Sequence, residues 1–158
     1  MLSRILVAVL FAVAPLAWSV DVVRDGKPVA VICVSANADQ QVQTAAELCV
    51  AYVRESTGAA LPIVSEPPEE GTVLFIGPNP FKLDLAGLDE DGYLIAFPDT
   101  RSIVIQGPTA WGTEYGVCEF LERYVGVRWL MPGKDGTDVP IRDSLSVPAD
   151  PVRGDPAF

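Results

Sequence analysis

The stretch GTEYGVCEFLERYVGVRWLMPG, residues 112–133, decides the fold expected of this chain. Thr109 precedes it and predicts a helix N-cap, and the helical pattern runs to Val125, where Gly126 is a typical C-terminal glycine. Val127–Leu130 then predicts a short strand. At about 100° per residue, the apolar side of this helix spans roughly 160° and consists of Phe120, Tyr124, Val117, Leu121, Val125 and Cys118.

A longer helix is predicted upstream. Asn37 stands three residues before Gln40 in a variant of the capping box, and the helical pattern continues to Thr57, with Gly58 as its stop. Its apolar side spans roughly 200° and consists of Leu48, Tyr52, Ala45, Cys49, Val42, Val53, Ala46 and Val50. A helix resting on one surface needs a stripe of only ~100°. We therefore expect the helix flanks to be covered by something beyond their own sheet, and to form an exposed apolar patch when this chain is alone.

The remaining apolar runs predict strands and two hairpins. Asp25-Gly26 is the turn of the first hairpin, and residues 98–101 join the strands of the second. The expected strands are Val20–Arg24, Pro28–Val34, Leu61–Val64, Thr72–Ile76, Tyr93–Phe97, Ser102–Gln106 and Leu145–Val147. Because hairpins are present and parallel crossovers are few, we expect an α+β fold, an antiparallel sheet with two helices packed on one face.

Composition bounds the class of protein. The chain has 158 residues, of which 49% are hydrophobic, and its mean hydropathy is +0.30. This is enough apolar material for one domain with a real core, and too little length for a large catalytic barrel beside it. Eleven basic and 21 acidic residues give a net charge of −10. That sign argues against nucleic acid and anionic membranes as partners.

Histidine and cysteine usage restricts the chemistry. The sequence has no histidine, so no Ser-His-Asp triad, Cys-His pair or histidine general base can be built from this chain alone. Cys33, Cys49 and Cys118 are an odd number of thiols, each inside an apolar segment. We interpret them as small buried residues; the alternative is a single Cys49–Cys118 bridge.

The first residues resemble a targeting segment. Arg4 supplies a positive charge, residues 5–17 are uncharged and mostly apolar, and Ala17-Trp18-Ser19 has the small residues of a cleavage site. The apolar run is shorter than the ~20 residues that a membrane anchor needs. We therefore predict that residues 1–19 are a cleaved signal peptide and that the protein is exported, to the periplasm or the medium.

Aromatic residues near the second helix are the candidate binding residues. Trp111 and Trp129, with Tyr115 and Tyr124, could form a platform on which a sugar ring stacks, although such residues are also common in cores and interfaces. Arg128 is either a cation–π or ion-pair element or a surface arginine. The predicted substrate-binding residues are therefore Trp111, Trp129 and Arg128.

Acidic residues are the other candidates for chemistry. Paired carboxylates catalyse glycoside hydrolysis, and three lie on the polar side of the second helix, namely Glu114, Glu119 and Glu122. A charged helix face is the more common meaning of that pattern. The acidic segment 84–92 resembles a calcium loop, but its register places Gly87 and Pro98 where ligands belong. We expect no catalytic residue, no metal and no cofactor in this chain.

Three segments together resemble a known module: residues 92–95, Ile103–Ile105 and above all residues 112–133. They are similar to the N-terminal domain of the α-glucuronidases of glycoside hydrolase family 67, to a related domain preceding large secreted bacterial proteins, and more distantly to the second domain of β-hexosaminidases and chitobiases. The resemblance covers about residues 20–150. It implies a non-catalytic α+β sandwich set against a (β/α)₈ barrel that carries the catalytic carboxylates.

The resemblance therefore implies an accessory domain over residues 20–148 and a linker, residues 149–158, leading to a catalytic barrel that this sequence does not contain. None of the family's catalytic positions lies in this stretch. The expected function is an accessory domain of an exported carbohydrate-active protein, active in polysaccharide breakdown, whose partner is the barrel of the same protein. The alternative is a free-standing carbohydrate-binding module that uses exposed aromatic residues.

Overall fold

The computed structural model describes residues 18–133 and 136–156, so the predicted signal peptide lies almost entirely outside it. In chain order the elements are β1 (Ser19–Arg24), β2 (Lys27–Pro28), β3 (Ala30–Cys33), α1 (Gln40–Thr57), β4 (Ile63–Val64), β5 (Thr72–Ile76), β6 (Tyr93–Asp99), β7 (Ser102–Gln106), α2 (Ala110–Phe120), η1 (Leu121–Val125), β8 (Arg128–Trp129), β9 (Thr137–Asp138), β10 (Leu145–Pro148) and β11 (Val152–Gly154). The expected α+β class with two main helices is confirmed.

The larger sheet has the strand order β11-β6-β7-β5-β3-β4. The expected antiparallel pairing joins β6 to β7 and to β11. β3, however, pairs in parallel with β4 and β5, and β5 pairs in parallel with β7, so this sheet is mixed. Two connections explain the difference. α1 returns the chain to the same end of the sheet between β3 and β4, and β5 is joined to β7 through the loop to β6 and the antiparallel strand β6 itself.

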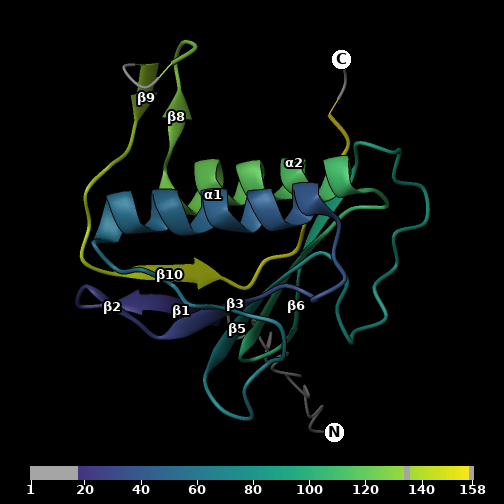
Figure 1. The fold of residues 1–158 in the computed structure, drawn as a ribbon, viewed down its shortest axis with the longest axis horizontal. Helices are drawn as coiled ribbons and strands as arrows, with labels where there is room; N and C mark the ends of the chain where they lie inside the picture. The colour runs from purple at the N-terminus through teal and green to yellow at the C-terminus, as the bar shows by residue number, and fades with distance from the viewer. Residues whose placement is uncertain (1–17, 134–135, 157–158) are drawn as a thin grey trace, which may run out of the picture.

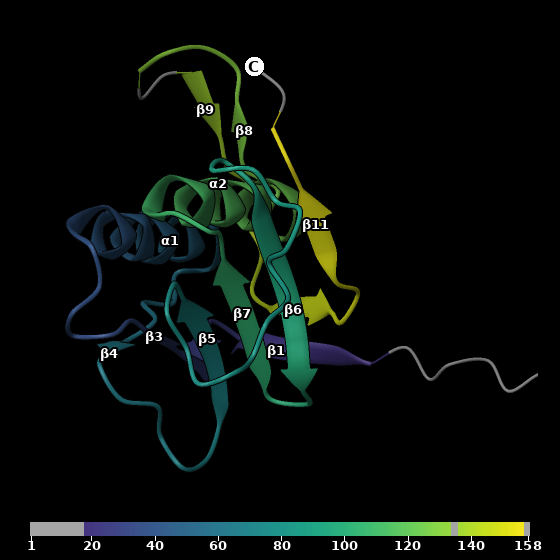
Figure 2. The same ribbon diagram turned by 90° about the vertical axis from the view of Figure 1, so that its right-hand side faces the viewer.

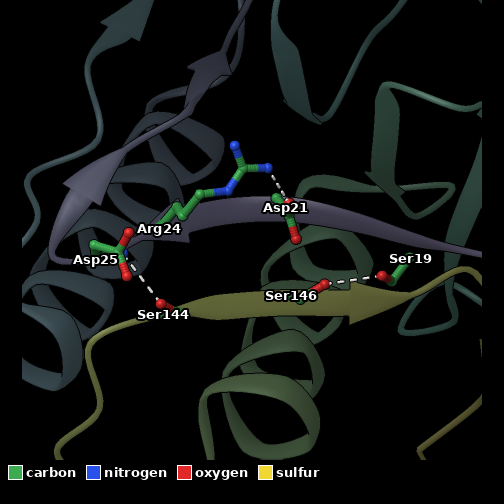
Figure 3. Close-up of polar contacts among 6 residues, drawn as sticks. All are labelled: Ser19, Asp21, Arg24, Asp25, Ser144 and Ser146. Carbon is green, nitrogen blue, oxygen red and sulfur yellow. Dashed lines mark hydrogen bonds and ion pairs between the residues drawn. The ribbon is translucent and has the colours of Figure 1, made fainter.

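A smaller sheet joins the two ends of the domain, in the order β10-β1-β2. The predicted Asp25-Gly26 hairpin is confirmed between β1 and β2, with φ angles of 50° and 69° at its two turn residues. Ser146 Oγ donates to Ser19 Oγ at 2.9 Å, and the Asp25 amide donates to Ser144 Oγ at 3.1 Å (Figure 3). One side-chain hydrogen bond, from Ser146 to Ser19, thus adds to the antiparallel pairing of β1 and β10, and the predicted cleavage after Ser19 would remove it.

The helix ends follow from their capping residues. Asp39, rather than Asn37, caps α1 by accepting a hydrogen bond from the amide two residues on (2.8 Å), because the chain still turns at residues 36–37. Thr109 caps α2 as predicted (3.1 Å). The second helix reaches Val125 as predicted, but its last turn, η1, is π-helical. Gly126 ends it with a φ of 89°, as its position in the sequence predicted.

The main core lies between the helices and both sheets. Figures 1 and 2 show α1 and α2 side by side over the strands, with β10 and β1 on the same side of the helices as the larger sheet. The large side chains fully buried in this core include Phe120, Leu121, Ile32, Leu74, Ile95, Ile105 and Leu145. A smaller cluster on the opposite face of the larger sheet consists of Cys33, Val73, Phe75 and Val104. The helices therefore have two sheets beneath them.

Two segments differ from their expected roles. The segment 149–158, predicted as a linker, contains β11, which pairs antiparallel with β6, with Val152 opposite Ile95. The flanks of α1 were expected to be exposed, but Leu48 and Val50 are half-buried and pack against the main core. Within residues 18–133 and 136–156, no helix is long and apolar enough to cross a membrane.

Candidate functional site

The two candidate tryptophans lie at opposite ends of the second helix. Trp111 is in the first turn of α2 and is 58% exposed, whereas Trp129 is in β8, beyond the end of η1, and is 38% exposed. The helix between them is about 24 Å long at 1.5 Å per residue. Tyr124, from the same predicted platform, packs its ring against Phe120 at 5.3 Å between centroids. The structure therefore does not assemble the predicted platform.

Trp129 instead pairs with Tyr52 of α1. Their rings meet edge to face, with centroids 5.7 Å apart and planes at 88°. The indole Nε1 of Trp129 donates a hydrogen bond to Tyr52 Oη at 3.1 Å. In the sequence, Tyr52 is one of the apolar residues of the first helix. Its place near the edge of that arc was the available signal that it could contact something besides the sheet.

Apolar side chains continue from Trp129 along the β8–β9 hairpin. Leu130 is 72% exposed and Met131 is 63% exposed. Together with Tyr52, Trp129, Pro132, Gly133 and Thr137 they line an open groove with a volume of about 640 Å³. We call Tyr52, Trp129, Leu130 and Met131 the hairpin patch. An exposed apolar patch was expected on the helix flanks, and it lies on this hairpin instead.

Arg128 makes hydrogen bonds to the backbone rather than to a ligand-binding surface. Its guanidinium donates to the backbone oxygens of Glu122 and Val127, both at 3.0 Å. Carbonyl groups at the end of a helix lack partners within the helix, and arginine commonly satisfies them. This residue therefore closes the end of η1 and fixes the start of β8.

Two of the three helix carboxylates have different partners. Glu114 accepts a hydrogen bond from Gln41 Nε2 at 2.6 Å, and Glu119 forms an ion pair with Arg123, also at 2.6 Å. Glu119 and Glu122 line one shallow hollow on the surface. Residues three apart project from the same side of a helix, whereas glycosidase carboxylates must lie on both sides of the bond that is cleaved. The arrangement therefore does not form a glycosidase site.

All three cysteines are free thiols, and the alternative of a Cys49–Cys118 bridge is not found. Cys33 and Cys49 are buried as expected, whereas Cys118 is only partly buried. Cys49 is fully buried, and burial raises its pKa to about 12. Burial, with the nearby Glu114 and Glu122, raises the pKa of Cys118 to about 11. Both thiols are therefore protonated at neutral pH, which makes them poor nucleophiles. Among the described residues, no group of three or more acidic or cysteine side chains is placed to hold a metal ion.

Comparison with solved structures places this fold inside much larger enzymes. A 4-O-methyl-α-glucuronidase of family GH115 matches with a TM-score of 0.52 at 18% identity, over 82% of this chain and 18% of that chain. The GH20 β-N-acetylhexosaminidase from Streptomyces coelicolor A3(2) matches with a TM-score of 0.57 at 16% identity, over 92% and 25%. A chitobiase from Flavobacterium johnsoniae matches with a TM-score of 0.51 at 13% identity, over 87% and 19%.

These likenesses establish a fold that occurs within glycoside hydrolases, and the chain spans only 18–25% of the length of these three enzymes. The expected distant similarity to β-hexosaminidases and chitobiases is supported at the level of the fold. No family model matches the sequence, and no curated protein matches it. The closer resemblance to family 67 therefore stays a hypothesis.

Proposed function

We propose that this chain is the non-catalytic accessory domain of an exported, carbohydrate-active protein, and that it packs against a glycoside hydrolase barrel. The observation that carries the proposal is the asymmetry of coverage. A match over 92% of this chain takes up only 25% of a GH20 enzyme. Within the family 67 hypothesis, the parent protein is an α-glucuronidase.

The chemistry of the chain supports the same proposal. The sequence has no histidine, and Glu114, Glu119 and Glu122 all project from one helix. General acid catalysis of glycoside cleavage needs a carboxyl group beside the scissile oxygen, with a second one across the sugar. Because Glu114, Glu119 and Glu122 provide neither arrangement, the chain's contribution would be to support the barrel and shape its surroundings.

The test compares two proteins. One is the 158-residue chain, and the other is the longer product that is translated from its gene together with the coding sequence immediately downstream. The 158-residue chain is expected to hydrolyse neither aldobiouronic acid nor aryl glycosides, and the longer product is expected to hydrolyse at least one of them. The accessory role would be refuted if the short chain hydrolysed a glycoside and if Glu119→Gln abolished that activity. Mass spectrometry of the secreted N-terminus tests export, with cleavage after Ser19 as the expected result.

A free-standing carbohydrate-binding module is the second candidate, because Trp111 exposes most of its surface at the start of α2. Affinity electrophoresis in gels containing plant polysaccharides would measure this activity. The module would be favoured if the polysaccharide slowed migration of the chain, if Trp111→Ala abolished this effect and if Leu130→Ala preserved it. We expect no retardation.

A further inference from the structure

The hairpin patch is an apolar surface that the described chain leaves uncovered. Trp129, Leu130 and Met131 are consecutive, and each is more than a third exposed. None of the three belongs to either buried cluster of the domain. Soluble proteins rarely expose adjacent large apolar side chains without a partner for them.

The patch is also held in one shape. The amides of Leu130 and Met131 share the carbonyl oxygen of Gly136, at 2.7 and 3.3 Å. A Cβ on Gly136 would lie 2.1 Å from the Met131 oxygen, so only glycine permits this approach. The Tyr52–Trp129 hydrogen bond connects the hairpin to α1. A surface fixed in this way loses little conformational entropy on binding.

The composition of the patch favours a protein over a sugar. Sugar sites combine an aromatic ring with several free hydrogen-bonding groups, whereas the indole N–H of Trp129 is already donated to Tyr52. Leu130, Met131 and Pro132 add apolar area beside the ring. Tryptophan, tyrosine and methionine are the residue types enriched in protein interfaces.

The position of the patch indicates which protein would cover it. In both Figure 1 and Figure 2 the β8–β9 hairpin projects from the helix layer on the side away from β10 and β1. The residues after β11, up to Pro156, run toward that same side. Figure 1 shows this end and the hairpin at opposite ends of the helix layer, so a domain continuing from the C-terminal end would begin beside the outer side of the helices, the side from which the hairpin projects.

We propose that the hairpin patch is the surface onto which the following domain of the same polypeptide docks, through an apolar area on that domain. This inference rests on the proposed function, which supplies the following domain. It adds that the contact is centred on the hairpin at the C-terminal end of the helices, with Leu130 and Met131 as its apolar anchors.

Hydroxyl-radical footprinting of the 158-residue chain and of the longer gene product tests the proposal. Met131 should be oxidised rapidly in the short chain and much more slowly in the longer product, because the packed core of an interface excludes solvent from the side chains that it covers. Ile63 is the internal control, because it is 46% exposed on the edge strand β4. Its modification rate should be the same in both proteins.

A matched pair of variants of the longer product gives a second measurement. Leu130→Ser combined with Met131→Ser should accelerate proteolysis between the domains about tenfold, the loss expected for interface anchors, while Ile63→Ser should leave it unchanged. Equal Met131 oxidation in a longer product that hydrolyses glycosides would overturn the docking surface and keep the accessory function. A longer product without glycosidase activity would count against the accessory function instead. Protection of the short chain by raised protein concentration or by oligosaccharide would overturn the proposal in favour of a second copy or a sugar.

Discussion

The inner side of the second helix and the hairpin that follows it are equally apolar in sequence but have opposite environments. Phe120 and Leu121 are fully buried between the helices and the sheets, whereas Leu130 and Met131 are mostly exposed only a few residues later. The first pair belongs to a helical repeat that faces strands from both sheets. The second pair lies on a two-stranded hairpin that projects from the helix layer (Figure 1).

The difference shows that apolar character alone does not tell core from interface. A repeat of apolar residues at helical spacing specifies which side faces inward, because only one side can pack on a sheet. A short apolar run at the end of an element carries no such direction. Its burial depends on what lies next to it in space, inside the chain or outside it.

The strongest test of this comparison is a pair of truncations. Phe120→Ala removes a fully buried ring, and should lower the free energy of unfolding by about 3–5 kcal/mol because the surrounding core cannot fill the cavity. Leu130→Ala should change it by less than ~0.5 kcal/mol. Urea unfolding followed by circular dichroism measures both. A loss of similar size for the two variants would mean that the hairpin belongs to the chain's own core.

A pH titration tests the buried half of this comparison, through a thiol in the main core. The folded state holds the Cys49 proton up to a pKa of about 12, against an ordinary value of 9.0, because burial disfavours the thiolate. The contribution of the Cys49 thiol to the free energy of unfolding is therefore complete below pH 9 and is lost as the pH rises toward 12. The loss at pH 11 is roughly 2–3 kcal/mol, given about 1.4 kcal/mol per pKa unit. Cys49→Ala should make the curve less steep above pH 9, and Cys118→Ala should do so by a smaller amount, because the pKa of Cys118 is raised only to about 11.

Two neighbouring residues of α2 allow a finer test. A Cβ at Gly112 would lie 2.2 Å from the backbone oxygen of Gly92, so Gly112→Ala must push the helix away from that segment. We expect a cost of about 1–3 kcal/mol. Trp111→Ala, one residue earlier but exposed, should stay within ~0.5 kcal/mol. Chemical denaturation of the two variants decides the matter, and equal stabilities would show that the close approach is absent in solution.

The smallest effect is expected at the hairpin itself. Tyr52→Phe removes the hydrogen bond to Trp129 and keeps the ring, so the stability of the whole domain should fall by about 0.5 kcal/mol or less. The indole ¹⁵N–H resonance of Trp129 should shift, while that of Trp111 should not move. An unchanged Trp129 resonance would mean that the two side chains do not interact in solution.

The sequence predicted most elements of the fold and few of the contacts at the candidate site. Local signals sufficed where the structure depends on local chemistry, as at the Thr109 cap and the Asp25-Gly26 turn. The parallel pairing of β5 with β7 was missed, because it depends on the loop connecting β5 to β6 rather than on either strand. The pairing of Trp129 with Tyr52 joins residues 77 positions apart, and nothing in either local pattern specifies it.

The smaller sheet has a consequence for the order in which the domain is built. During synthesis β1 leaves the ribosome early, but its partner β10 follows more than a hundred residues later. Until then Val20 and Val22 belong to a strand with an unpaired edge, which is the kind of surface that joins other chains. The smaller sheet can form only when Leu145–Pro148 has emerged from the ribosome. A nascent chain stalled before Leu145 should therefore aggregate or need a chaperone, even with both helices already made.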